Sequence, residues 1–137
     1  MAIVNPDLHD HRKIVVIATF ESSVLLRKDT TWATPLWNFP RIHKRTVPYG
    51  LRSVARRTLI YVTGIRAPIE RFRPFGTIDE PVPIDVFKID LTSEDASSIS
   101  LKGDAPIQIR LFPFTELEGM SDLKNECRRI IRGLGGK

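Results

Sequence analysis

The sequence predicts an α+β domain in which a mixed β-sheet lies between two helices. Three observations indicate this fold class. Apolar, β-branched stretches lie before and after a central amphipathic helix, a second amphipathic helix lies near the end of the chain, and 137 residues suit one domain. The apolar content of 42% is that of an ordinary globular protein. We expect an N-terminal arm over residues 1–11 and a single domain over residues 12–137.

The first elements predict a strand hairpin followed by an aromatic strand. Residues 12–20 (RKIVVIATF) are apolar and β-branched, residues 21–23 give a turn signal, and residues 24–27 return as the partner strand. Residues 37–39 predict a short aromatic strand, and residues 41–47 predict a long basic loop. We expect the large rings of the aromatic strand, Trp37 and Phe39, to pack beneath the central helix.

The central helix is predicted over residues 48–63. Its apolar positions fall on one face at helical spacing: Leu51, Val54, Ala55, Leu59 and Val62. Pro48 suits the first turn, and Gly64 supplies the C-terminal stop. The outer face carries basic residues and the helix has no acidic residue, so no ion pair offsets their mutual repulsion.

The second half predicts further strands and a closing helix. Strands are expected over residues 69–75, 82–91 and 107–112, a loop over residues 92–105, and a turn over residues 114–120. Ser121 is interpreted as the N-cap of the last helix. An apolar stripe follows in that helix: Leu123, Cys127, Ile130, Ile131 and Leu134. Its cysteine is therefore expected in the core, not as a nucleophile.

Charge is distributed unevenly along the chain. Residues 1–73 carry thirteen Lys or Arg and five Asp or Glu, while residues 74–137 carry eight and eleven, so the halves sum to +8 and −3. One interpretation is that the basic side chains are solvated and meet their counter-charges when the acidic half folds against them. The other is a functional surface for an anionic partner, which the overall charge of +5 also favours.

Several classes of protein are excluded. No stretch approaches the ~20 apolar residues of a membrane span. The single cysteine cannot form an internal disulfide, and no Cys/His spacing is that of a zinc finger. His9, Asp10 and His11 are interpreted as solvated side chains and not as a metal site. We therefore expect a soluble, intracellular (cytoplasmic) protein that does not bind membranes.

Residues 37–65 (WNFPRIHKRTVPYGLRSVARRTLIYVTGI) resemble the motif region of Nudix hydrolases, the MutT-like superfamily. In that family, W-x-F-P-G-G precedes a loop and a helix of pattern R-E-aliphatic-x-E-E-x-G-aliphatic. The matching segments are Trp37 to Pro40, Ala55 to Arg57, Leu59, and Thr63 to Ile65. The likeness extends over residues 12–134 at the level of pattern. The resemblance implies a Nudix-like α/β/α sandwich with a mixed β-sheet between helices.

The residues that perform the chemistry of the family are missing. Its three helix glutamates, which hold Mg²⁺ or Mn²⁺, correspond to Thr58, Tyr61 and Val62. Residues 41–69 contain no Asp or Glu, so shifting the alignment by a residue or two restores no ligand. The resemblance therefore implies a degenerate member with no catalytic residues, no metal site and no cofactor.

A metal-free Nudix-like domain is predicted to be a binding module for RNA or a nucleotide. Guanidinium groups contact phosphate directly, without a bridging cation. The candidate phosphate-facing residues share one basic stretch: Arg41, His43, Lys44, Arg45, Arg52, Arg56 and Arg57. Trp32 and Tyr49 are the candidate stacking residues, and Arg57 also matches an arginine of the family with a structural role. Two alternatives remain open: an adaptor or subunit that binds an acidic protein surface, and a divergent metal-dependent hydrolase of nucleoside-diphosphate-linked substrates.

Overall fold

The computed structural model describes residues 12–44, 50–78, 83–99 and 107–133. The predicted N-terminal arm lies outside the described residues. The strands are β1 (Arg12–Phe20), β2 (Ser23–Asp29), β3 (Arg41–Lys44), β4 (Arg73–Ile78), β5 (Ile84–Asp90) and β6 (Ile107–Pro113). The helices are α2 (Leu51–Thr63), η1 (Ile69–Arg71), α3 (Ser93–Ser97), α4 (Phe114–Leu117) and α5 (Asn125–Gly133). Within the described residues, no helix has the length and apolar character that crossing a membrane requires.

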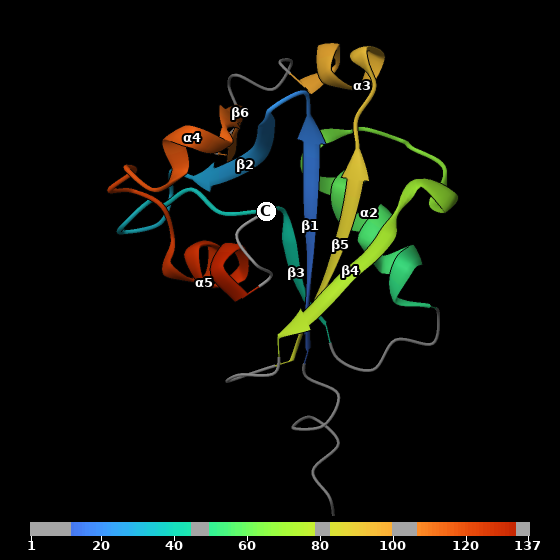
Figure 1. Cartoon of the computed structure of the whole chain (residues 1–137), viewed down its shortest axis with the longest axis horizontal. Coiled ribbons are helices and arrows are strands. Elements are labelled where there is room, and N and C mark those ends of the chain that lie inside the picture. Colours follow the sequence, from blue (N-terminus) through green and yellow to red (C-terminus); the bar gives the residue numbers. More distant parts are fainter. Residues whose placement is uncertain (1–11, 45–49, 79–82, 100–106, 134–137) are drawn as a thin grey trace, which may run out of the picture.

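One mixed sheet organises the fold. Its strand order is β4-β5-β1-β2-β6, and β3 pairs separately with β1. β1 and β5 are parallel and lie side by side at the centre of the molecule, with α2 to the right and α4 and α5 to the left (Figure 1). The other edge of β1 is divided. Residues 12–15 pair with β3, whereas residues 19–20 pair with β2.

Two apolar cores cover the two faces of this sheet. Alternate residues of β1 supply each core, as the two-residue repeat of a strand requires. On one face Ile14 and Val16 pack with Val54 and Leu59 of α2. The other face packs against α5 and contains Val15, Ile17, Trp37, Phe39, Cys127 and Ile130. The predicted sandwich with a mixed sheet between helices is confirmed, as is the burial of the cysteine.

Trp37 and Phe39 are buried, but their environment differs from the predicted one. They lie in the core beneath α5, not beneath α2. Instead of a regular strand, this segment makes isolated bridges, from Asn38 to Arg27 and from Trp37 to Leu123. Ser121 is therefore not the N-cap: the last helix begins only at Asn125, because the preceding residues bond to Trp37.

The predicted basic loop over residues 41–47 is wrong in its first half. Arg41–Lys44 form β3, antiparallel to the start of β1. The reason is that β2 leaves this part of β1 unpaired, and its backbone groups need partners. Ile42 packs against the α2-side core, whereas Arg41 projects to the α5 side. Residues 45–47 lie outside the described part of the chain.

The predicted strand over residues 69–75 is also corrected. The segment begins with the helical turn η1, in which Arg71 and Phe72 donate backbone hydrogen bonds of 3.1 Å each to Pro68 and Ile69. The turn places the Phe72 ring in the α2-side core, where it is fully buried. β4 starts only at Arg73.

Gly64 ends α2 as the sequence predicts. Its N–H donates to the carbonyl of Ile60 at 2.8 Å, and its φ of +81° lies in the left-handed region. A Cβ at this position would meet no atom within 4 Å. The glycine is therefore required by the backbone conformation and not by lack of space.

Gly64→Ala is expected to lower the free energy of unfolding by about 1 kcal/mol, because alanine in the left-handed region is strained. Urea denaturation measures the change. Gly119→Ala is the matched control, since Gly119 has no positive φ and its nearest contact would be 3.9 Å away. An equal loss in both variants would contradict the conformational explanation.

Candidate functional site

The three predicted arginines of α2 lie on the outer surface of the helix. Arg52 and Arg57 are exposed, while Arg56 is half-buried and its Nε donates to the carbonyl of Ala67 at 2.8 Å. Arg56 and Arg57 line a shallow cavity of about 440 Å³ together with Glu70. The carboxylate of Glu70 therefore lies beside the positive charges of Arg56 and Arg57.

Arg41 does not belong to that surface. It projects from β3 toward α5, and its Nε lies 3.3 Å from Oε1 of Glu126. His43 and Lys44 contribute their backbones to β3. Arg45 and Tyr49 lie outside the described residues. The structure thus divides the predicted site between two surfaces.

Arg41 instead joins three cations that were not among the predicted site residues. We call this group the basic cluster: Lys13, Arg27, Arg41 and Lys124. Burial lowers the pKa of Lys124, and the charges of Arg41, Lys13 and Arg27 lower it further, against an opposing effect of Glu126. The pKa of Arg27 is lowered chiefly by burial and also by Arg41. Because Arg41, Lys13 and Arg27 all act on Lys124, the four positive charges lie in one region of the molecule.

Four separate segments position the basic cluster. Lys13 is at the start of β1, Arg27 is near the end of β2, and Arg41 is in β3 opposite Val15. Lys124 precedes α5, where its N–H donates to the carbonyl of Trp37 at 2.9 Å. The sheet and the bridge to α5 therefore bring together residues that are far apart in the sequence.

Trp32, a predicted stacking residue, lies beside the basic cluster. Its ring centroid is 5.0 Å from Nζ of Lys124 and 6.0 Å from the guanidinium carbon of Arg27, and the side chain is 40% exposed. Asp29 shapes the loop by accepting hydrogen bonds from the backbone N–H and the hydroxyl of Thr31, at 3.0 and 2.6 Å. The hydroxyl bond is the main reason that the pKa of Asp29 is lowered.

Glu126 is the buried counter-charge of the cluster. Its carboxylate accepts hydrogen bonds from Nζ of Lys13 at 2.5 Å and Nδ2 of Asn38 at 3.1 Å. Burial raises the pKa of Glu126, but the Lys13 and Asn38 hydrogen bonds and the charge of Arg41 outweigh it, so the pKa is lowered. The carboxylate is therefore ionised at neutral pH and ties β1 and β3 to α5.

Two of the four cations, Arg27 and Arg41, have a buried Nε atom that makes no hydrogen bond within the described residues. Nε of Arg41 is near Glu126 without the alignment of a hydrogen bond, and among the described residues the buried Nε of Arg27 also has no hydrogen-bond partner. Buried polar groups are ordinarily hydrogen-bonded, so two such donors in one cluster are unusual. Partly buried cations beside an exposed aromatic ring suit an anionic ligand.

The positions that correspond to the family's glutamates do not fit a divalent cation. Thr58 is buried, and its hydroxyl donates to the carbonyl of Val54 at 2.8 Å. Val62 is buried in the protein, whereas Tyr61 is 78% exposed. Hard cations need several oxygen ligands, including carboxylates. Across the described ranges, no group of three or more His, Cys, Asp or Glu side chains is placed to hold a metal ion.

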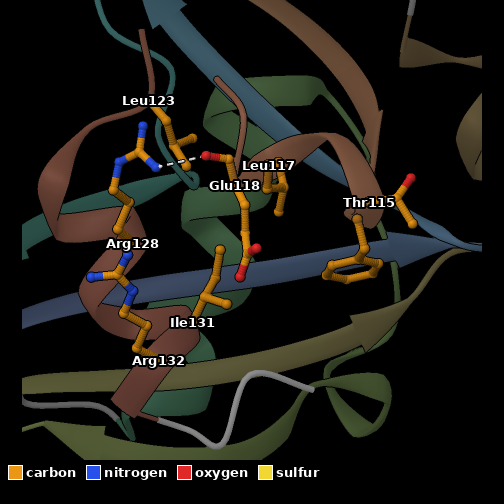
Figure 2. A pocket seen from close by; sticks show the side chains of 8 residues that line it. Thr115, Leu117, Glu118, Leu123, Arg128, Ile131 and Arg132 are labelled. Atoms are coloured by element: carbon orange, nitrogen blue, oxygen red, sulfur yellow. Dashed lines mark hydrogen bonds between the residues drawn. The ribbon is translucent and has the colours of Figure 1, made fainter. Parts of the chain in front are cut away.

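A second cavity lies between α4 and α5 (Figure 2). It has a volume of about 170 Å³ and an apolar wall that includes Leu117 and Ile131. Arg128 donates to the carbonyls of Glu118, at 3.4 Å, and Met120. Because these bonds fasten α5 to the turn after α4, we interpret Arg128 as a structural residue.

No family model and no curated protein matches the chain in sequence. Solved structures do match in fold. A mutT/nudix family protein from Listeria innocua has a TM-score of 0.70 at 19% identity, and the match covers 93% of this chain and 93% of that chain. The chain has the Nudix fold.

Two further Nudix-fold neighbours differ in what they do. The C-terminal domain of mouse MUTYH, solved in complex with human PCNA, has a TM-score of 0.69 at 15% identity, covering 89% of this chain and 85% of that chain. A bifunctional NMN adenylyltransferase/ADP ribose pyrophosphatase from Francisella tularensis, complexed with AMP and a manganese ion, has a TM-score of 0.69 at 14% identity, covering 91% of this chain and 41% of that chain. Hydrolases are common among these neighbours.

The site residues that were not predicted have only a weak signal in the sequence. Lys13 begins an apolar strand and Arg27 follows the apolar run of β2, so each is a charge beside a predicted core segment. Lys124 and Glu126 carry no such signal. Their role depends on where α5 begins, which the predicted N-cap at Ser121 places three residues too early.

Proposed function

We propose that this Nudix-fold chain is a non-catalytic module that binds the phosphate of RNA or a nucleotide at the basic cluster. The observation that carries the proposal is that Arg27 and Lys124 approach the partly exposed ring of Trp32. In the part of the chain that the structure describes, the buried Nε atoms of Arg27 and Arg41 also have no hydrogen-bond partner. Arg41 and Trp32, both predicted from the sequence, belong to this site.

Binding without a metal ion is supported by α2, where Thr58, Tyr61 and Val62 stand in place of the family's metal-binding glutamates. A metal ion held by carboxylates would neutralise the negative charge of a phosphate. A guanidinium group neutralises that charge directly and donates hydrogen bonds to two phosphate oxygens at once. Tyr61 stands where the family has a glutamate, and its phenol is close enough to Arg27 to affect the pKa of that guanidinium. Arg27 therefore lies near the helix position at which other members of the family hold a metal ion with their glutamates.

A second candidate function uses the outer face of α2. Arg52 and Arg57 are exposed on one helix, which suits an acidic protein surface. The Nudix-fold domain of mouse MUTYH, solved in complex with human PCNA, gives a precedent for protein binding on this fold. Charge reversal of Arg52, Arg56 and Arg57 to Glu tests this surface separately.

Arg27→Gln is expected to weaken ligand binding at least about tenfold, since a hydrogen bond to a charged group contributes about 1.5–3 kcal/mol. Titration calorimetry with AMP and anisotropy of a 3′-labelled single-stranded RNA, both in EDTA, measure the loss. Binding to wild type should also weaken steeply with salt. The thermal midpoint of each variant checks that the fold is kept.

Arg73→Gln is the matched control, because Arg73 is exposed on β4 and pairs with Asp90 at 3.1 Å. It should bind like wild type. Binding that survives Arg27→Gln but is lost on reversal of the α2 arginines would assign the ligand to α2. Turnover of a nucleoside diphosphate that requires added Mg²⁺ or Mn²⁺ would show a hydrolase instead.

A further inference from the structure

A second tryptophan ring, that of Trp37, also carries two cations. Nζ of Lys28 lies 4.8 Å from the centroid of this ring, and the guanidinium carbon of Arg110 lies 5.3 Å from it. The same guanidinium carbon is 5.6 Å from the centroid of Phe112, whose ring packs edge-on against Trp37 with 4.8 Å between the centroids. Positive charge therefore continues beyond the basic cluster.

The pairing of β2 with β6 places both of these cations on one face of the sheet. In the antiparallel register, Leu26 lies opposite Arg110 and Lys28 lies opposite Gln108. Residues two apart on a strand share a face, and so do residues directly opposite each other on paired strands. Leu26 belongs to the core that packs against α5. Lys28 and Arg110 therefore lie on the α5 side, where β6 ends the order of strands.

The backbone of Trp37 and Asn38 connects this pair of cations to the pair over Trp32. Arg27 and Asn38 exchange backbone hydrogen bonds of 2.7 and 2.9 Å, and the carbonyl of Trp37 accepts from the N–H of Lys124 at 2.9 Å. Arg27 and Lys124 are the two cations that lie over Trp32. We call the four cations over the two tryptophan rings the cationic strip: Arg27, Lys28, Arg110 and Lys124.

The cationic strip is held by rings and not by carboxylates. An aromatic ring attracts a cation without cancelling its charge. In the described part of the chain, no ion pair joins a residue of the strip to a carboxylate, whereas Arg73 pairs with Asp90 at 3.1 Å. Asp29 is the one acidic residue in the sequence of β2 and β6, and its carboxylate accepts two hydrogen bonds from Thr31. The positive charges of the strip are therefore open to an anionic ligand.

We propose that the cationic strip binds a single strand of nucleic acid over several nucleotides, with a base on Trp32 and the backbone crossing Lys28 and Arg110. The inference rests on the proposed function and specifies a strand, not a mononucleotide, as its ligand. Proteins bind single strands by combining cations that follow the backbone with rings on which bases stack. Trp32 is 40% exposed and offers such a ring, whereas Trp37 is 3% exposed and only holds cations. Stacking needs unpaired bases, so a single strand fits and a duplex does not.

The length of the ligand provides the first test. Calorimetry in EDTA compares uridylate with its tetramer and octamer, and the octamer is expected to bind at least about tenfold tighter than uridylate because it spans both rings. Arg110→Gln and Lys28→Gln should each weaken octamer binding about fivefold and leave uridylate binding unchanged. Each should also reduce the salt dependence, the slope of log K against log salt, by about 0.7, while Arg110→Lys keeps it.

Lys88→Gln is the matched control. Nζ of Lys88 also lies over a ring, 5.4 Å from the centroid of Phe75, but β5 is separated from β2 by β1. This variant should bind the octamer like wild type. Trp32→Ala should weaken the octamer about tenfold, and Trp32→Phe should retain it. The thermal midpoint of each variant checks that the fold is kept.

Equal affinity for uridylate and the octamer overturns the strand, as does octamer binding that Arg110→Gln and Lys28→Gln leave unchanged, even if Arg27→Gln weakens uridylate. Equal binding of the octamer and of an RNA duplex overturns the single strand. An octamer of deoxyuridylate distinguishes the two sources of such a strand, since the tighter binder of the two octamers identifies it as RNA or DNA. If neither uridylate nor the octamer depends on Arg27, the proposed function itself fails.

Discussion

Replacing Glu126 with alanine is expected to lower the free energy of unfolding by about 3 kcal/mol, because loss of one partner leaves buried charge uncompensated. Lys13 and Arg41 lose their carboxylate, and Asn38 loses a hydrogen-bond acceptor. The two cations are 22% and 17% exposed, which places the effect at the lower end of the range for buried ion pairs. Urea denaturation at pH 7 measures it.

Glu116→Ala is the control, since Glu116 is an exposed carboxylate on α4. It should change stability by less than about 0.5 kcal/mol. A similar small change for Glu126→Ala would show that solvent, and not Glu126, balances the cations.

The same carboxylate makes stability depend on pH. Because the folded pKa of Glu126 lies below its unfolded value of about 4.3, its contribution is fully present above that pH. The contribution is lost as the pH falls through the folded pKa. The Glu126→Ala variant should therefore lose less stability than wild type on acidification.

Leu59→Ala is expected to cost about 2–5 kcal/mol, since truncation of a fully buried leucine removes apolar contacts and leaves a cavity. Leu59 has no exposed surface and lies between α2 and the sheet. Thermal and urea denaturation give the change. Tyr61→Ala on the same helix controls for helix effects, and its exposed ring should contribute little to stability. A negligible cost for Leu59→Ala would mean that this core tolerates the cavity.

The sequence predicts the elements whose periodicity is local. The apolar run of β1, the stripe of α2 and the alternation of β6 each determine their own conformation. β3 escapes prediction because RIHK is polar, and it becomes a strand only through the unpaired edge of β1. The start of α5 is likewise set by backbone bonds to Trp37, a residue 88 positions before Asn125.

The candidate site, too, was predicted only as far as neighbours in the sequence determine it. Arg41 was predicted from the basic stretch and Trp32 as a stacking residue, and both were grouped with the arginines of α2 because they are near in sequence. Their actual neighbours, Arg27 and Lys124, come from β2 and from the segment before α5. The order of the strands in the sheet decides which of these side chains become neighbours. That order cannot be deduced from the local sequence pattern.

The basic cluster also has an energetic consequence for the empty protein. Like charges held together repel one another, so part of the folding free energy is spent in keeping Arg27, Arg41 and Lys124 close. Dissolved salt, with a screening length of about 10 Å at 0.1 M, weakens that repulsion and also weakens the attraction for a phosphate. Ionic strength therefore acts in opposite directions on these two interactions: it relieves the repulsion among the cations and weakens their attraction for the proposed phosphate ligand.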